Sequence, residues 1–204
     1  MPWMRSPVHG IRVHFIRNTT MTKENLIFLD IETGGFSKKK NGICEIAIII
    51  TDGDLKEICS DQWIVKPYER CPSVQEQLGQ LVSYKPEAMA VNGISMEEIE
   101  NGCEAKQVAC SIWAYLNKYG GKVVGHNAKS FDGPWIEEFL LRFAYVFKLE
   151  VIDTLLIAKE NKTNYENHKL TTLLSHYGIK NDQSHRAMGD TRATMELYRC
   201  LTSN

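Results

Sequence analysis

The chain has 204 residues, of which 43% are hydrophobic and 24% are charged. This length suits one domain, and this composition excludes a wholly disordered chain, a collagen-like chain and a coiled-coil rod. The net charge is −1, so bulk charge does not indicate a nucleic-acid partner, and any phosphate must be bound locally or through metal. No apolar run approaches the roughly 20 residues that span a bilayer, so no membrane partner is expected.

The first residues differ from the rest of the chain. Residues 1–23 hold four basic residues and no acidic residue, and Pro2 and Pro7 interrupt any helical or strand period. We expect residues 1–21 to be a disordered extension of one domain that covers residues 22–204. A mitochondrial presequence is the alternative, but the two prolines and the scarcity of serine argue against it.

The six cysteines are scattered and form no C-x-x-C pair. Cysteines in this arrangement are typical of reduced thiols, which predicts the cytoplasm or another reducing intracellular compartment. Zinc is not expected, because the cysteines and histidines lack finger-type spacing.

The predicted elements begin with a meander of three strands and continue as alternating strands and helices. The three strands are expected at Asn25–Asp30, Ile43–Thr51 and Ile58–Val65. Helix is expected near residues 74–82, after the capping box Ser95–Glu98 and along residues 108–119, 134–143, 154–160, 170–177 and 187–201. Two further strands are expected at Lys122–His126 and Phe147–Ile152. This order implies an α/β fold, a mixed sheet with helices on its faces.

Two acids end the first predicted strand. Asp30 and Glu32 follow four buried-type residues, and side chains two apart on a strand point to the same face. Burying carboxylates is costly unless they are paired or bind metal, and ligands bind at this end of strands in α/β sheets. A polar strand end that faces solvent is the alternative, which the presence of two acids disfavours.

Three later residues have ordinary structural explanations when they are taken singly. Asp132 lies two residues before a proline and could cap a helix. Asp190 lies in the first turn of the last predicted helix, where the helix dipole stabilises a negative charge. His185 is a loop histidine, which often has no function. Together with Asp30 and Glu32, however, these acids could converge at one sheet edge, where they would repel each other unless divalent cations neutralised them. A two-metal site about 3.5–4 Å wide suits phosphodiester hydrolysis.

Five blocks of sequence then carry a resemblance to a known family. They are LDIETGG (29–35), VNGIS (91–95), GHNAKSFD (125–132), IDT (152–154) and HRAMGDTRAT (185–194). Each block alone is weak, but the five in this order, over about residues 25–200, are specific. The chain resembles the DEDDh 3′–5′ exonucleases, which include proofreading exonuclease subunits of DNA polymerases, ribonuclease T, oligoribonucleases and the three-prime repair exonucleases.

The resemblance implies a ribonuclease-H-like fold, with a five-stranded mixed sheet in the order 3-2-1-4-5 flanked by helices. It implies that Asp30, Glu32, Asp132 and Asp190 are catalytic acids that bind two Mg²⁺ ions, for which Mn²⁺ can substitute. It also implies that His185 is the general base, a role that suits the ordinary histidine pKa of ~6.5.

The third block departs from the pattern of many members. H-N-A-K-S-F-D is one residue longer than their H-N-A-x-F-D. The three-prime repair exonucleases have a similarly long spacing, but the change leaves the reach of Asp132 open.

The resemblance also implies substrate contacts. The turn at Thr33 and Gly34 would hold the terminal 3′-OH through its amides, and Ile94 would be an apolar wedge against the terminal bases. His126 and Asn127 would touch the substrate backbone. The alternatives are a simple turn, a core residue before a capped helix and side chains that hydrogen-bond their own loops.

The resulting prediction is a metal-dependent 3′–5′ exonuclease that hydrolyses nucleic acid, with DNA favoured, to 5′-mononucleotides. Its partner would be nucleic acid with a free 3′ end, single-stranded or frayed. One alternative is an exoribonuclease similar to oligoribonuclease. Another is an inert binding module, which the presence of all four acids and the histidine disfavours. Whether a polymerase or a second copy of the chain is a partner stays open.

Overall fold

The computed structural model describes residues 24–70, 79–120, 122–161 and 163–203. The expected N-terminal extension, residues 1–21, lies outside these described residues, so its disorder stays a prediction. The division of the chain into this extension and one domain stays a prediction as well.

A five-stranded mixed sheet forms the centre of the fold, in the order β3-β2-β1-β4-β5. The strands are β1 (Leu26–Thr33), β2 (Ile43–Thr51), β3 (Glu57–Ile64), β4 (Lys122–Gly125) and β5 (Val151–Asp153). The first three strands pair antiparallel, and β4 and β5 run parallel to β1. The predicted strand order is therefore confirmed.

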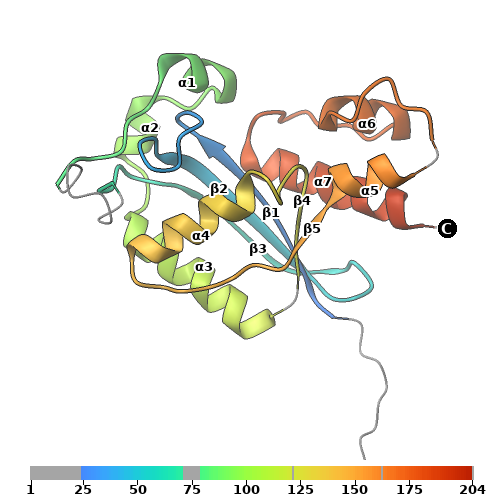
Figure 1. Cartoon of the computed structure of the whole chain (residues 1–204), viewed down its shortest axis with the longest axis horizontal. Coiled ribbons are helices and arrows are strands. Elements are labelled where there is room, and N and C mark those ends of the chain that lie inside the picture. The colour runs from blue at the N-terminus through green and yellow to red at the C-terminus, as the bar shows by residue number, and fades with distance from the viewer. Residues whose placement is uncertain (1–23, 71–78, 121, 162, 204) are drawn as a thin grey trace, which may run out of the picture.

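Helices cover both faces of this sheet (Figure 1). They are α1 (Pro86–Asn92), α2 (Met96–Glu100), α3 (Ala105–Tyr119), α4 (Asp132–Arg142), α5 (Thr154–Glu160), α6 (Leu170–Tyr177) and α7 (Ala187–Thr202). Figure 1 shows α3 and α4 on one side of the sheet and α5, α6 and α7 on the other. Because both faces are covered, β2 is buried at every position, which explains its nearly continuous apolar sequence.

The two faces of β1 pack against different helices. Apolar residues of one face belong to the core that α3 and α4 close, and they are Ile27, Leu29 and Ile31. On the other face, Phe28 packs against Met195 of α7. Because side chains alternate along a strand, Asp30 and Glu32 share the face of Phe28 and are directed toward α7.

The short helices near the end of the sheet follow local signals in the sequence. The predicted capping box is confirmed: Ser95 Oγ accepts a hydrogen bond from Glu98 N, and Glu98 Oε2 accepts one from Ser95 N. The helix α1 was not predicted, although Pro86 in its first turn and Gly93 after its end, with φ of 68°, are typical boundary residues.

Two predicted elements differ from the structure. The last strand was expected at Phe147–Ile152, but β5 is only Val151–Asp153. It pairs with the short strand β4 alone, and Leu149 N donates instead to Glu137 Oε1, so the preceding apolar residues pack on the core without strand pairing. The helix expected near residues 74–82 lies mostly outside the described residues, and residues 79–82 are not helical.

Within the described part of the chain, no helix combines the length and the apolar character needed to cross a bilayer.

Candidate active site

Three carboxylates converge where the C-terminal part of β1 meets the start of α7. Asp30 and Glu32 come from β1, and Asp190 comes from the first turn of α7. Their carboxylate oxygens all lie within 4.8 Å of one another. The structure thus brings together three of the four acids that the sequence analysis selected.

The fourth acid, Asp132, adjoins β1 from the start of α4. Asp132 is buried, with 4% of its surface exposed, and its Oδ1 accepts a hydrogen bond from Ile31 N at 3.2 Å. The alternative that Asp132 caps a helix is wrong: α4 begins at Asp132 itself, and the residue before it, Phe131, makes no side-chain cap hydrogen bond. After burial, the charge of Asp132 is the next cause that raises the pKa of Asp30.

The longer loop before Asp132 is folded around Asp153. One oxygen of Asp153 accepts hydrogen bonds from the amides of Asn127 and Leu155, at 2.9 and 3.0 Å, and the other accepts from the amide of Lys129 at 3.0 Å. Asn127 adopts a left-handed conformation with φ of 61°. The additional residue of GHNAKSFD is therefore accommodated within a bonded loop, and Asp132 still reaches the backbone of β1.

Burial and mutual repulsion shape the charge of this cluster. Burial, followed by the charges of Asp132, Asp190 and Glu32, raises the pKa of Asp30 well above its ordinary value. Burial is also the main reason that the pKa of Glu32 rises to about 8 and that of Asp132 to about 7. Carboxylates in this state retain protons near neutral pH unless a cation replaces them.

The predicted general base lies beside the cluster. His185 is an exposed residue in the loop before α7, and its backbone N donates to Asp190 Oδ2 at 3.0 Å. Asn181 Nδ2 donates to the other oxygen, Oδ1, at 2.6 Å. The structure therefore places His185 next to a carboxylate of the cluster, with its side chain accessible to solvent. Its role as a base stays a prediction.

The predicted turn at the end of β1 is already occupied by protein contacts. Gly34 N donates to Gly42 O at 2.8 Å, and Gly34 O accepts from Lys85 N at 2.8 Å. The ring of Tyr84 packs so closely on Gly34 that a Cβ atom there would collide with it. Glycine is thus required here for approach to Tyr84, and the contact of the Gly34 amide with a 3′-OH stays a prediction that this geometry does not favour.

The other predicted substrate residues differ in exposure. Ile94 is 2% exposed and packs in a small core with Cys44 and Ile99. This agrees with the alternative that Ile94 is a core residue. The ring nitrogens of His126 lie 3.0 Å from Thr154 Oγ1 and from a backbone carbonyl oxygen, so neither is open to a substrate in this conformation. Asn127 is exposed. Substrate contact by these residues stays a prediction.

A family model for ribonuclease T-type proteins, described as "Exonuclease", matches residues 27–198 of the chain. The chain belongs to this exonuclease family. The predicted family and the predicted enzyme class are confirmed by this membership. All five sequence blocks that carried the resemblance lie within the matched residues.

Two curated bacterial relatives of this exonuclease are much longer proteins. The chain is 29% identical over 181 residues to "3'-5' exonuclease DinG" of Bacillus subtilis (strain 168), covering 87% of the chain and 18% of the relative. It is 28% identical over 179 residues to "DNA polymerase III PolC-type" of Clostridium perfringens, covering 86% of the chain and 11% of the relative. The chain therefore spans less than a fifth of the length of either relative.

Among solved structures, the exonuclease resembles Escherichia coli exonuclease I in complex with a dT13 oligonucleotide. The TM-score is 0.73 at 20% identity, and the match covers 88% of this chain and 41% of the other. This likeness concerns the fold, and it confirms the predicted ribonuclease-H-like class of the exonuclease.

The acidic cluster of this exonuclease fits the divalent metal on which the family depends. Asp30, Glu32 and Asp190 offer only carboxylate oxygens, the hard ligands that Mg²⁺ and Mn²⁺ prefer. Their raised pKa values, which arise from burial and repulsion, are the state expected of acids whose natural counter-charge is a bound cation.

An apolar pocket of about 450 Å³ opens beside Glu32 and was not predicted. Its wall includes Phe36, which is 88% exposed, Val91, which is 61% exposed, and Phe131. Lys85 adds a positive charge. One sequence signal could have indicated this wall. Phe36 directly follows the glycines of the first block, and it belongs to no helical or strand pattern that would place it in the core.

The sequence analysis also missed the importance of Glu45. It lies opposite Glu32 in the register of β1 and β2, is fully buried, and binds Arg186 through two hydrogen bonds. A charge within an otherwise apolar strand was the available signal, although the residue that pairs with it could not be read from the pattern.

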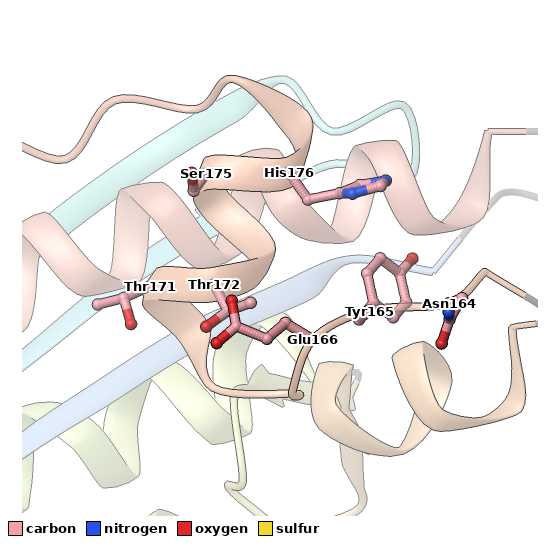
Figure 2. Close-up of a pocket in the computed structure, with 7 residues that line it drawn as sticks. All are labelled: Asn164, Tyr165, Glu166, Thr171, Thr172, Ser175 and His176. Carbon is pink, nitrogen blue, oxygen red and sulfur yellow. The ribbon is translucent and has the colours of Figure 1, made fainter.

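The exonuclease has a second hollow, of about 410 Å³, on the surface of α6. Figure 2 shows Thr171, Thr172 and Ser175 of α6 beside it, together with Glu166 of the preceding segment. None of the predicted catalytic or substrate-binding residues lines this hollow, and it is separate from the acidic cluster.

Proposed function

We propose that this exonuclease removes nucleotides one at a time from the 3′ end of DNA and releases 5′-mononucleotides. The observation that carries the proposal is the acidic cluster of Asp30, Glu32 and Asp190, with Asp132 adjoining it. Glu32 of this cluster also lines an apolar pocket. The direction of digestion and the preference for DNA are supported by the printed names of the relatives, a 3′–5′ exonuclease and a DNA polymerase III.

The acids of the cluster would hold two Mg²⁺ ions, and Mn²⁺ would substitute. When bound, the divalent ions polarise the phosphate, lower the pKa of the attacking water and stabilise the leaving oxygen. Asp30 is central among the residues, because the charges of all three other acids act on it. Glu32 and Asp190 approach it from β1 and α7, and Asp132 is held to the backbone of β1 by a hydrogen bond from Ile31 N.

His185 would accept the proton of the attacking water. Its backbone N donates a hydrogen bond to Asp190, so the residue lies at the edge of the cluster. Its exposure leaves the imidazole free to receive a proton and to pass it to solvent.

The apolar pocket would receive the base of the terminal nucleotide. Phe36 and Phe131 offer aromatic surface for stacking, which tolerates every base and therefore suits an enzyme that shortens strands without sequence preference. Lys85 would add a contact to a phosphate beside an otherwise acidic site. A base can enter such a pocket only when it is unpaired, so we infer that the substrate end is single-stranded or frayed.

Digestion of 5′-labelled oligonucleotides tests this function. Single-stranded DNA, blunt duplex DNA and RNA of one sequence would be compared with Mg²⁺ and with EDTA, with Asp30→Asn as the inactive control. We expect single-stranded DNA to give a ladder of progressively shorter labelled fragments that depends on Mg²⁺.

Four other results would contradict parts of the proposal. Immediate release of the labelled nucleotide would indicate digestion from the 5′ end, and cleavage of circular single-stranded DNA would indicate an endonuclease. Faster digestion of the RNA would favour the alternative of an exoribonuclease. Binding of all three substrates without cleavage would favour an inert module.

A further inference from the structure

Glu45 is a charged residue, the third of β2, in a strand that is buried along its whole length. Its side chain is 0% exposed. Its carboxylate accepts hydrogen bonds from Arg186 Nε at 3.1 Å, from Arg186 Nη2 at 2.9 Å and from Ala187 N at 2.8 Å. Gln62 Nε2 is a fourth donor. Because both carboxylate oxygens accept hydrogen bonds from two donors each, Glu45 is held in a fixed position on the sheet and serves as an anchor.

Arg186 connects this anchor to the start of α7. It is the residue that precedes the helix, and its planar guanidinium binds both oxygens of Glu45, which fixes its orientation as well as its distance. A second carboxylate, Glu98 Oε1, lies 3.8 Å from Nη1. The position of Arg186 relative to the sheet is therefore set by two elements that are distant in sequence, β2 and α2.

The residue before Arg186 has an uncommon backbone conformation. His185 has φ of 64°, in the left-handed region that costs energy for residues other than glycine. Its side chain is exposed, so burial of its ring in the core does not hold this conformation. On one side its backbone N is bound to Asp190 Oδ2 at 3.0 Å, and on the other side it is joined to the anchored Arg186.

We propose that Arg186, anchored on Glu45, is a positioning residue that holds His185 in this left-handed conformation and so sets where the imidazole stands relative to the acidic cluster. The inference rests on the proposed function, in which His185 accepts the proton of the attacking water. Arg186 itself has its guanidinium occupied by Glu45, so it acts through the neighbouring histidine.

A purely structural role is the rival explanation, and a second ion pair of α7 provides the comparison. Arg192 Nη1 binds Glu57 Oε2 of β3 at 3.0 Å, so it also joins α7 to the sheet, but both side chains are partly exposed. Lysine keeps the charge at both positions, but only at Arg186 does it lose a two-pronged geometry. Arg192→Lys is therefore the matched control for Arg186→Lys.

The experiment is a double-mutant cycle in the full chain. Wild type, Arg186→Lys, His185→Ala and the double variant would be assayed on single-stranded DNA for kcat, KM and the Mg²⁺ concentration that gives half-maximal rate. We expect Arg186→Lys to lower kcat by ~10–100-fold with KM and Mg²⁺ dependence unchanged, since small misplacement of a catalytic group has effects of this size. In the His185→Ala background the same substitution should change kcat by less than about 2-fold. Arg192→Lys should resemble wild type.

A crystal structure of Arg186→Lys gives a readout that is independent of activity. We expect the φ of His185 to leave the left-handed region while α7 and the sheet keep their positions. If Arg186→Lys does not melt cooperatively, Glu45→Gln takes its place, because the amide keeps the shape of the anchor but loses its charge. The same separation of kcat from KM is then expected.

Several results would overturn the inference. Losses that add fully in the double variant would show that Arg186 does not act through His185. If Arg186→Lys needs much more Mg²⁺ but recovers the full rate at saturation, the ion pair of Arg186 and Glu45 positions the metal-binding Asp190 and not His185. A crystal structure in which His185 keeps its conformation would also count against it. Failure of the proposed function is distinguishable, because it would appear as absence of Mg²⁺-dependent digestion by the wild type.

Discussion

Glu32 of β1 lies directly opposite Glu45 of β2 in the antiparallel register. Like charges directly opposite each other on paired strands repel, and the two carboxylates have different surroundings. Arg186 neutralises Glu45, whereas burial, followed by the charges of Asp190 and Glu45, raises the pKa of Glu32 to about 8. The cluster thus carries more potential negative charge than Arg186 balances, and protons or divalent cations supply the difference.

The first prediction concerns the stability of the metal-free protein as a function of pH. The pKa of Glu32 is raised, so between about pH 4 and pH 8 the folded state binds more protons than the unfolded state. The contribution of Glu32 to stability is therefore present in full at low pH and is lost as pH rises toward 8. Glu32→Gln removes this titration.

We therefore expect Glu32→Gln in EDTA to melt at nearly the wild-type temperature at pH 5 and increasingly above it toward pH 8. Comparison of the two proteins cancels the titration of groups that do not interact with Glu32. Melting temperatures at four pH values would measure the effect, and a constant difference between the proteins across this range would refute it.

The second prediction is that Asp30→Asn abolishes digestion and stabilises the metal-free fold. The charges of all three other acids and burial oppose ionisation of Asp30, so a neutral amide of the same shape relieves repulsion. Activity assays with Mg²⁺ and thermal melts in EDTA test the two parts. Asp61→Asn, on β3, which β2 separates from β1, lies outside the cluster and is the control for the substitution itself. Mg²⁺-dependent cleavage by purified Asp30→Asn would sink the assignment.

The third prediction is that divalent metal stabilises the folded protein. A ligand that binds only the native state at ~100 times its Kd adds about 2.7 kcal/mol to the free energy of unfolding. For a domain of this size, this corresponds to a rise in Tm of about 5–10 °C. Melts with Mg²⁺ or Mn²⁺ should include a 5′-mononucleotide, because metal affinity without nucleotide can be weak.

Asp30→Asn should lose most of this metal-dependent rise, while Asp61→Asn should keep it. An equal response of wild type and Asp30→Asn would mean that the metal stabilises the chain somewhere other than the acidic cluster.

The fourth prediction is that His185→Ala lowers kcat by ~10²–10⁴-fold with little change in KM. The substitution removes the imidazole but keeps the backbone N that donates to Asp190, so the acids stay in place. Rates measured over a range of Mg²⁺ concentrations separate the possibilities. Recovery of the full rate at high Mg²⁺ would show that His185 serves the metal site and is not the base.

The fifth prediction concerns the apolar pocket. Phe36 is 88% exposed on its wall, so Phe36→Ala should not disturb the core but should remove a stacking surface. Stacking contributes about 1–3 kcal/mol per base, which predicts a KM for single-stranded DNA that is ~5–150-fold higher. Val146→Ala, at a residue that is 80% exposed and lines a different pocket, is the control. Equal KM values for the two variants would remove Phe36 from the substrate site.

Much of the fold could be predicted because its elements have strong local patterns. The buried run of β2 and the capping box at Ser95 are examples, and the structure contains both. The strand β5 was predicted too early in the chain, because apolar residues such as Phe147 and Leu149 look the same whether they pair in a sheet or only pack against a helix. A local pattern of apolar residues indicates that a segment is buried. Strand pairing also requires a neighbouring strand that is long enough.

The sequence by itself indicated which acids could share one site, and the structure groups three of them, Asp30, Glu32 and Asp190. Alternation along β1 placed Asp30 and Glu32 on one face, and the position of Asp190 in the first turn of a helix is a local property. Only the tertiary structure decided how these acids are held. The donor that Asp132 accepts from, Ile31 N, is 101 residues away, and Arg186 is 141 residues from Glu45. The physical reason is that a hydrogen-bond partner is chosen by which elements pack together, and no periodicity within one element contains that information.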